Sequence, residues 1–178
     1  MPPLSVSLNP HPAHPSPAID TVAVSIERAG AGLTLVYRVQ GDLDRVRLPS
    51  GESGVRRNGL WQQTCFELFV RDGSSGGYIE YNFSPGGDWA AYAFQSYRDG
   101  GEPLTCRPPT IAMRRSDDIL QMTAALFDLP ASVASKALHL GPTVIIDAID
   151  GTRSYWALDH LSKAPDFHQS KTFKFSLD

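Results

Sequence analysis

The chain has 178 residues, with 16 basic and 19 acidic side chains and a formal net charge of −3. This length favours one domain that folds without a metal ion or disulfides, and the slight acidic excess argues against a nucleic-acid-binding surface, which would need clustered lysine and arginine. No apolar run approaches membrane-spanning length, and the first ten residues lack the pattern of a secretion signal. We therefore expect a single soluble, cytoplasmic domain over residues 1–178 that binds neither nucleic acid nor membrane, with its oligomeric state open.

The first part of the chain alternates short β-favouring runs with turn-forming residues. Ala29-Gly30-Ala31-Gly32 separates two such runs and predicts a hairpin. The elements expected here are an edge strand at 4–8, an extended proline-rich linker at 10–17, strands at 21–27 and 33–39, a short strand or turn at 42–49, and a loop at 50–58.

Three aromatic-rich runs, at residues 59–71, 78–85 and 88–98, are separated by glycine-rich breaks and predict a three-strand antiparallel meander. Because side chains alternate across a strand, one face should belong to the core. That core face is expected to hold Phe66, Leu68, Val70, Ile79, Tyr81, Phe83, Tyr92 and Phe94. The opposite face is expected to hold Trp61, Gln63, Cys65, Glu67, Tyr78, Glu80, Asn82, Trp89, Ala91, Ala93, Gln95 and Tyr97. This second set is too aromatic for an ordinary solvated face and too polar for a core, so it marks a candidate site.

Short strands continue through the rest of the chain. Met, Ala and Leu in residues 119–127 favour a helix, but the length of the run and the turn before it favour a strand. The expected elements are an edge strand at 106–114, a strand at 119–127, a helical turn at 129–136, strands at 138–149 and 154–158 joined by an Asp150-Gly151 turn, and a last strand at 172–177. Short strands at this spacing, without a long amphipathic helix, predict an all-β fold, a two-sheet antiparallel β-sandwich of jelly-roll type.

Several linked motifs resemble one group of proteins. They lie at residues 60–69, 78–85, 89–94, 154–158 and 165–168. Together they resemble the bacterial DOMON-like proteins, which are similar in turn to family-nine carbohydrate-binding modules. The resemblance implies a β-sandwich that binds a sugar or a haem and has no established catalytic role. In the related modules tryptophans stack on the sugar, a role that the resemblance would give here to Trp61, Trp89 and Trp156.

The polar face of the meander has the two kinds of group that a sugar site needs. A flat aromatic platform packs on the C–H face of a sugar ring, and planar polar groups bind its hydroxyls at the edge. Trp61 and Trp89 could form the platform, and the edge groups would be Glu67, Glu80, Asn82 and Gln95. Ala91 and Ala93 would leave a depression between them. In the competing structural interpretation, the tryptophans seal the ends of the sandwich and the glutamates pair with Arg71, Arg98 or backbone groups.

We therefore predict a non-enzymatic module that binds a small polar ligand, a sugar or sugar-like molecule, on the concave sheet face. One alternative is a haem-binding or electron-transfer module, whose axial ligands would come from Met113, Met122, His139, His160 and His168. A second is a glycoside-processing enzyme that uses Glu67 and Glu80 as its carboxylate pair. His160 and His168, with Asp159 and Asp166, form a cluster in one loop, for which loop-ordering hydrogen bonds are favoured over a metal site.

Asp147 interrupts a strand that is otherwise apolar on both faces. A buried carboxylate without a partner costs several kcal/mol, so this one should be paired. We expect the partner to be Arg153, across the Asp150-Gly151 turn, or a group of the 160–168 loop, and the role of Asp147 to be structural.

Overall fold

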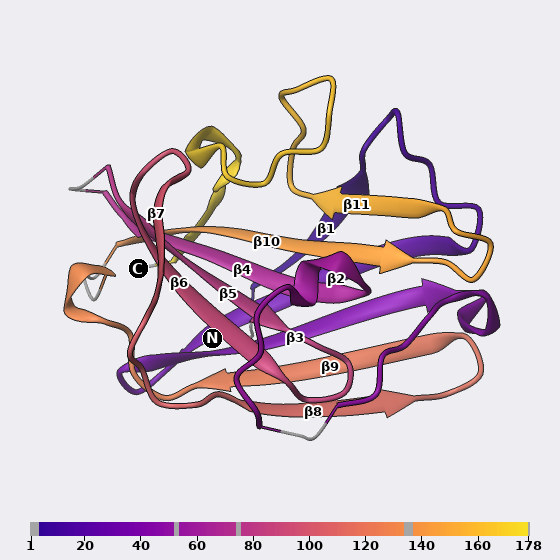
Figure 1. The fold of residues 1–178 in the computed structure, drawn as a ribbon, viewed down its shortest axis with the longest axis horizontal. Helices are drawn as coiled ribbons and strands as arrows, with labels where there is room; N and C mark the ends of the chain where they lie inside the picture. Colours follow the sequence, from indigo (N-terminus) through magenta and orange to yellow (C-terminus); the bar gives the residue numbers. More distant parts are fainter. Residues whose placement is uncertain (1–3, 52–53, 74–75, 134–136, 178) are drawn as a thin grey trace.

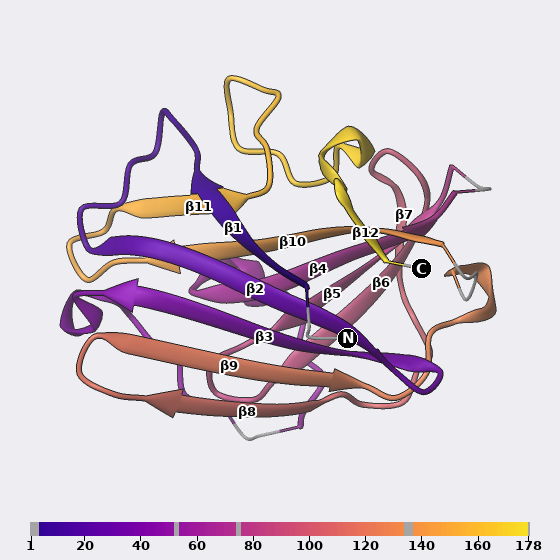
Figure 2. The same ribbon diagram turned by 180° about the vertical axis from the view of Figure 1, so that it is seen from behind.

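Twelve β-strands and four single-turn 3-10 helices form the regular structure of the computed structural model, which describes residues 4–51, 54–73, 76–133 and 137–177 (Figures 1 and 2). Neighbouring strands pair in antiparallel fashion throughout these segments. No helix in the described part of the chain is long or apolar enough to cross a membrane. The 3-10 helices are η1 (Leu43–Arg45), η2 (Leu60–Gln62), η3 (Ala131–Val133) and η4 (Ser170–Thr172).

The first sheet is built around the predicted N-terminal hairpin. Its strands, in spatial order, are β1 (Leu4–Pro10), β2 (Ile19–Ala29), β3 (Gly32–Gly41), β9 (Ile119–Leu126) and β8 (Thr110–Arg115). Strand β9 alternates between half-buried and buried residues along its whole length. That alternation is the period of a strand with one face on the core, and it confirms the strand interpretation over the helical one.

The second sheet contains the predicted meander. Its strands, in spatial order, are β7 (Asp99–Pro103), β6 (Trp89–Ser96), β5 (Tyr78–Phe83), β4 (Cys65–Asp72), β10 (Leu138–Asp147) and β11 (Arg153–Ala157), with β12 (Phe175–Leu177) also paired to β10. Strand β1 joins the sheets, since its residues 4–8 pair with β2 while Asn9 and Pro10 pair with β11.

The two sheets face each other across one apolar core. Val24 and Leu35 of the first sheet belong to the same buried cluster as Phe66, Tyr81 and Val144 of the second. Tyr37 crosses the core to donate a hydrogen bond from its hydroxyl to the backbone oxygen of Glu67. The predicted two-sheet antiparallel sandwich is confirmed, while the jelly-roll order stays a prediction.

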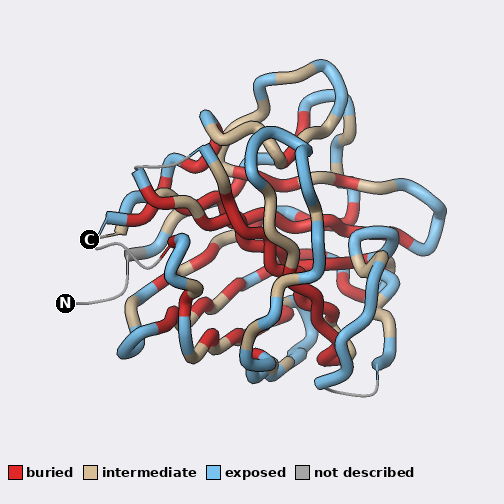
Figure 3. The backbone as a smooth tube through the Cα atoms, turned by 60° about the vertical axis from the view of Figure 1, so that its left-hand side comes forward, coloured by how far each residue is buried: buried red, intermediate tan, exposed pale blue. Residues whose placement is uncertain are grey.

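Strands β4 and β5 are buried on both of their faces, and Figure 3 shows the buried stretches at the centre of the molecule. Their inner face packs on the first sheet. Their outer face lies below η2 and the loop at residues 158–169, which both pass over the second sheet (Figure 1). Because η2 and this loop cover the outer face, its polar side chains are shielded from bulk solvent.

The predicted face of strand β6 is wrong by one residue. Phe83 lies opposite Trp89 and Tyr81 lies opposite Ala91, and paired residues share a face of the sheet. Trp89 and Ala91 therefore belong to the core, and Tyr92 lies on the outer face. A one-residue shift moves every side chain of a strand to the other face, and the turn at Pro85–Gly87 sets this register.

Most of the remaining expectations at the described residues hold with small changes in length. The linker expected at 10–17 is not extended throughout, because the backbone N–H of His14 donates a hydrogen bond of 2.8 Å to the backbone oxygen of His11. Residues 42–49 form η1 and an isolated bridge at Val46, and the last strand begins at Phe175 instead of Thr172. The helical turn expected at 129–136 is present as η3, and residues 134–136 lie outside the described part. Cys65 and Cys106 are free thiols.

Candidate functional site

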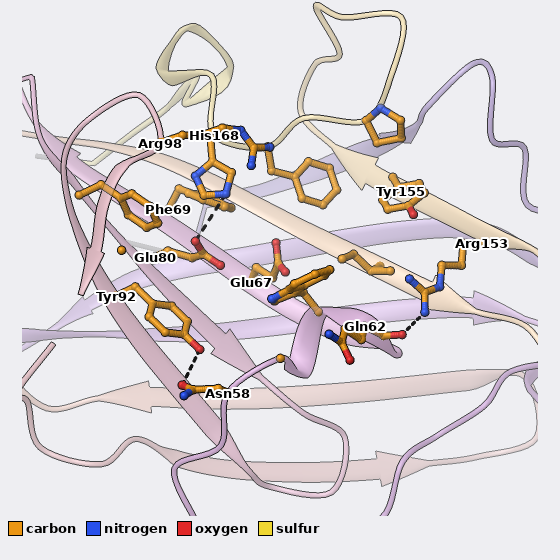
Figure 4. Close-up of a pocket in the computed structure, with 17 residues that line it drawn as sticks. Asn58, Gln62, Glu67, Phe69, Glu80, Tyr92, Arg98, Arg153, Tyr155 and His168 are labelled. Carbon is orange, nitrogen blue, oxygen red and sulfur yellow. Dashed lines mark hydrogen bonds and ion pairs between the residues drawn. The ribbon is translucent and has the colours of Figure 1, made fainter. Parts of the chain in front are cut away.

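A cavity of about 850 Å³ opens on the outer face of the second sheet. Strands β4, β5, β6, β10 and β11 form its floor and sides, and η2, the β6–β7 turn and the C-terminal loop form its rim (Figure 4). The lining residues are Asn58, Gly59, Trp61, Gln62, Glu67, Phe69, Glu80, Tyr92, Phe94, Arg98, Gly101, Ile145, Arg153, Tyr155, Pro165, Phe167 and His168.

Two buried carboxylates lie on the floor of this cavity. Glu67 of β4 is 3% exposed and Glu80 of β5 is 6% exposed. Thr143 donates a hydrogen bond of 3.1 Å from its hydroxyl to the Glu67 carboxylate. Burial raises the pKa of Glu67, and the charge of Glu80 raises it further. Burial also raises the pKa of Glu80, to about 7, so this carboxyl group exchanges its proton near neutrality.

Neither carboxylate is paired with an arginine in the described residues. The competing interpretation expects such pairs with Arg71 or Arg98. Arg98 lies close enough to lower the pKa of Glu80 by its charge, but its guanidinium contacts Asp166. The nearest cationic candidate to Glu80 is the imidazole of His168, whose Nε2 is 3.7 Å from a Glu80 oxygen. That distance is longer than a hydrogen bond.

His168 is held as a neutral ring over Glu80. Burial lowers its pKa to about 4, and the nearby charge of Arg98 lowers it too. The Tyr78 hydroxyl accepts a hydrogen bond of 3.2 Å from the backbone N–H of Arg98 and lies 2.8 Å from Nδ1 of His168. When this hydroxyl donates its proton to Nδ1, the proton of the neutral ring lies on Nε2, the nitrogen that faces Glu80.

The β6–β7 turn and the C-terminal loop are locked together at the rim. Asp166 accepts hydrogen bonds from the Tyr97 hydroxyl at 2.6 Å, from the Arg98 guanidinium at 2.9 Å and from the backbone N–H of His168 at 3.1 Å. Arg98 has a φ of 55°, an uncommon backbone conformation for a residue other than glycine. These contacts fix the loop that carries Phe167 and His168 over the floor.

At the other end of the cavity, Arg153 lies in a second polar cluster. Its side chain is 3.5 Å from the carboxylate of Asp147 and donates a hydrogen bond to the backbone oxygen of Gln62 in η2. Arg47 lies 3.5 Å from the other oxygen of Asp147. The predicted Arg153 partner is confirmed, and Arg47 is an additional partner that the local sequence did not indicate.

Aromatic side chains make the walls. Trp61 follows Gly59, whose φ of 75° suits glycine, and its side chain stays 48% exposed at the rim. The ring of Phe94 stacks on Tyr78 at 4.8 Å, and the Tyr92 hydroxyl donates a 3.0 Å hydrogen bond to the side-chain oxygen of Asn58. The cavity therefore offers apolar ring faces above a carboxylate floor.

Asn82 lies on the same face of β5 as Glu80 and directly opposite Glu67 in the ladder. Its side chain is fully buried, outside the cavity lining, and a hydrogen-bonding contact with Glu80 lowers the pKa of that carboxyl. That contact falls short of full hydrogen-bond geometry, because neither amide atom has a partner at normal distance and angle within the described residues. Asn82 therefore favours the ionised form of Glu80 from a position beside the floor.

This strand arrangement is shared with solved carbohydrate-binding proteins. A protein from Bacteroides uniformis that is proposed to bind carbohydrate matches 97% of this chain and 84% of its own, with a TM-score of 0.68 and 13% sequence identity. A family-nine carbohydrate-binding module from Caldicellulosiruptor kristjanssonii, solved with cellotriose, matches 87% of this chain and 71% of its own, with a TM-score of 0.55 and 8% identity. This chain has the fold of a carbohydrate-binding module.

A module of the same family and organism, solved with glucose, has a TM-score of 0.56 and 9% identity over 96% of this chain and 82% of its own. Identities this low establish a common fold and no more. No protein family matches the sequence, and no curated protein does. The DOMON-like assignment stays a prediction.

Within this module-like fold, the predicted site residues divide into two groups. Trp61, Glu67 and Glu80 line the cavity, and Asn82 lies beside its floor. The expected positions of three others are wrong, because their side chains lie elsewhere. Trp89 and Trp156 are buried in the core between the sheets, and Gln95 is exposed near the end of β6 and outside the lining set. The depression expected at Ala91 is also absent from this face, since Ala91 faces the core.

Sequence reasoning missed most of the cavity walls. Tyr92 and Phe94 were expected in the core because of the one-residue error on β6, and Tyr155 lies on the opposite face from the neighbouring Trp156. The motif at residues 165–168 carried a usable signal, because Pro165, Phe167 and His168 all line the cavity.

Five residues were candidates for haem ligands. Among the described residues, His168 is the one of these five that lines the cavity. Met122 is buried in the core opposite Met113, and His160 is 2.8 Å from the backbone oxygen of Asn9. The described segments also contain no group of three or more His, Cys, Asp or Glu that could hold a metal ion. His160, Asp159 and Asp166 take part in loop hydrogen bonds, as expected from their sequence context.

Proposed function

We propose that this protein is a binding module that holds a small sugar in the cavity above β4, β5 and β6. The observation that carries the proposal is the pairing of buried carboxylates, Glu67 and Glu80, with aromatic walls in one open cavity of about 850 Å³. A sugar has an apolar C–H face and polar hydroxyls at its edge, and this combination of groups complements both. The fold shared with carbohydrate-binding modules supports the same proposal.

Trp61 supplies the aromatic face at the entrance in this proposal, and Glu67 and Glu80 bind hydroxyl groups at the floor, with Asn82 in contact with Glu80 beside it. Gln62 and Asn58 place further amide groups at the rim. Because Trp89 and Trp156 are buried in the core, a change in tryptophan fluorescence on ligand binding would come mainly from Trp61.

The test is a titration of the protein with glucose, cellotriose and other mono- and oligosaccharides, followed by tryptophan fluorescence and calorimetry. We expect Trp61→Ala to weaken sugar binding by at least about tenfold, equivalent to about 1.4 kcal/mol. Ile149→Ala, which removes an exposed apolar side chain outside the cavity, is the matched control and should bind like the parent. The proposal fails if no sugar gives a signal, or if Trp61→Ala binds as tightly as the parent.

The alternative function, processing of glycosides, can be tested with the same mixtures of protein and cellotriose. Glu67 and Glu80 are diagonal neighbours on adjacent strands, since Glu67 lies opposite Asn82 and Glu80 lies opposite Phe69. A binding module leaves an oligosaccharide intact. Chromatography of cellotriose after long incubation should therefore recover it unchanged, and release of shorter sugars would replace the binding proposal with an enzymatic one.

A further inference from the structure

The floor of the cavity holds two carboxyl groups that the surrounding cations do not pair with directly. The two arginines that line the cavity each contact a different carboxylate, Arg98 at 2.9 Å from Asp166 and Arg153 at 3.5 Å from Asp147. The Glu67 carboxylate accepts a hydrogen bond from the Thr143 hydroxyl, and Glu80 faces the neutral ring of His168. Ionised carboxylates this deeply buried are normally paired with a cation. Without one, burial raises the pKa of both Glu67 and Glu80, and a bound cation would favour their ionised forms.

Aromatic side chains lie next to the Glu80 carboxyl group. Phe69 and Tyr92 are the cross-strand neighbours of Glu80 on the two sides of β5, and both line the cavity. The face of an aromatic ring attracts a cation. Carboxyl groups flanked by aromatic rings therefore suit a positively charged ligand group.

Asn82 acts on the same carboxyl from beside the floor. Its fully buried amide lies on the same face of the sheet as the two glutamates, outside the cavity lining, and its contact with Glu80 lowers the pKa of that carboxyl. An amide N–H that donates to a carboxylate favours the ionised form, which is the form that binds a cation.

We infer that the ligand is an amino sugar, whose protonated amine lies between Glu67 and Glu80. This inference rests on the proposed function of sugar binding in the same cavity. An ammonium group has three donors and can bind both carboxylates at once, whereas a hydroxyl of a neutral sugar has one. Hydrogen bonds between ionised groups are also about twice as strong as neutral ones.

The binding should depend on pH through the carboxylates. Protonation of Glu80 removes the negative charge that attracts the amine, and protonation of Glu67 acts in the same direction. The titratable and charged groups around Glu80 come from every element packed on it: Cys65 and Glu67 from β4, Tyr78 from β5, Tyr92 from β6, Arg98 from the β6–β7 turn, and His168 from the C-terminal loop, with Asp166 paired to Arg98. Any protonation of His168 would add a positive charge, so each of these changes on acidification weakens the binding of a cation.

The experiment compares glucosamine, N-acetylglucosamine and glucose by calorimetry with the full chain. At about pH 7 we expect glucosamine to bind at least about tenfold more tightly than either neutral sugar. At about pH 5, where the free amine is still protonated, the preference should fall below about threefold because the floor is protonated. The comparison between these two conditions needs no variant.

Glu80→Gln and Glu67→Gln should each reduce the preference for glucosamine, and Glu27→Gln, on the exposed part of the first sheet, is the matched control. Circular dichroism and thermal unfolding verify that the variants are folded. If glucose and N-acetylglucosamine bind as tightly as glucosamine at about pH 7, the inference is wrong and the proposed function stands. If none of these three sugars binds, the inference is wrong, and the proposed function fails as well when cellotriose and the other oligosaccharides also give no signal.

Discussion

The two faces of strands β4 and β5 are made from alternate residues of the same segments, and both are buried, but for different reasons. The inner face, with Phe66, Leu68 and Tyr81, packs directly on the first sheet in one apolar core. The outer face, with Glu67 and Glu80, is covered by η2 and the C-terminal loop, which leave a cavity between them and the sheet. Burial by a packed sheet removes space, whereas burial under loops encloses polar groups and leaves room for a ligand.

The largest expected effect lies on the inner face. Phe66 is fully buried and its ring contacts that of Tyr37 with 5.3 Å between centroids. We expect Phe66→Ala to lower the free energy of unfolding by about 3–5 kcal/mol, because a cavity opens in a close-packed core. Denaturant unfolding measures the change. Phe94→Ala, on the half-buried outer face, should cost clearly less, and equal losses would mean that the two faces are packed alike.

The outer face should respond to pH where the inner face does not. The pKa of Glu80 rises from an ordinary 4.5 to about 7, so the folded state binds its proton more tightly than the unfolded state. Its contribution to stability is therefore fully present below about 4.5 and is lost as the pH rises through about 7. This difference sets an upper limit of about 3 kcal/mol, at about 1.4 kcal/mol for each pKa unit.

Glu80→Gln removes that titration. We expect the variant to gain stability relative to the parent between about pH 5 and about pH 8, as measured by urea unfolding of both proteins at each pH. The pKa of His168 is lowered to about 4, which acts in the opposite direction, favouring stability above its ordinary 6.5. Because both proteins keep His168, its contribution largely cancels in the difference between them. A difference that is the same at both pH values would contradict the raised pKa of Glu80.

A smaller effect is expected at the edge of the outer face, at Asp147. Its carboxylate is buried and lies 3.5 Å from both Arg47 and Arg153. We expect Asp147→Ala to lower the free energy of unfolding by about 1–3 kcal/mol, because two arginines lose a shared partner. Asp44→Ala, which removes a carboxylate that is 89% exposed and paired with Arg115, should change it by less than about 1 kcal/mol. If Asp147→Ala lowers the free energy of unfolding by no more than Asp44→Ala does, burial does not strengthen the contacts of Asp147 with Arg47 and Arg153.

The strands and turns were largely predictable because their signals are local. Glycine-rich breaks and alternating apolar residues marked the hairpin of β2 and β3 and the meander of β4, β5 and β6. The isolated carboxylate of Asp147 in an apolar strand predicted a partner, and Arg153 is that partner. Glu67 and Glu80 were also predictable site residues, since carboxylates are unusual among so many aromatic side chains.

The sequence alone therefore determined the all-β class, most strand positions and the polar character of one sheet face, because alternation and turn chemistry act over a few residues. The tertiary structure decided which aromatics face the cavity, because a one-residue change in register exchanges the faces of β6. It also brought the 165–168 segment over Glu80 and the Arg47 side chain to Asp147. These contacts join residues 88 and 100 positions apart in the chain, a separation at which no local pattern indicates what will meet.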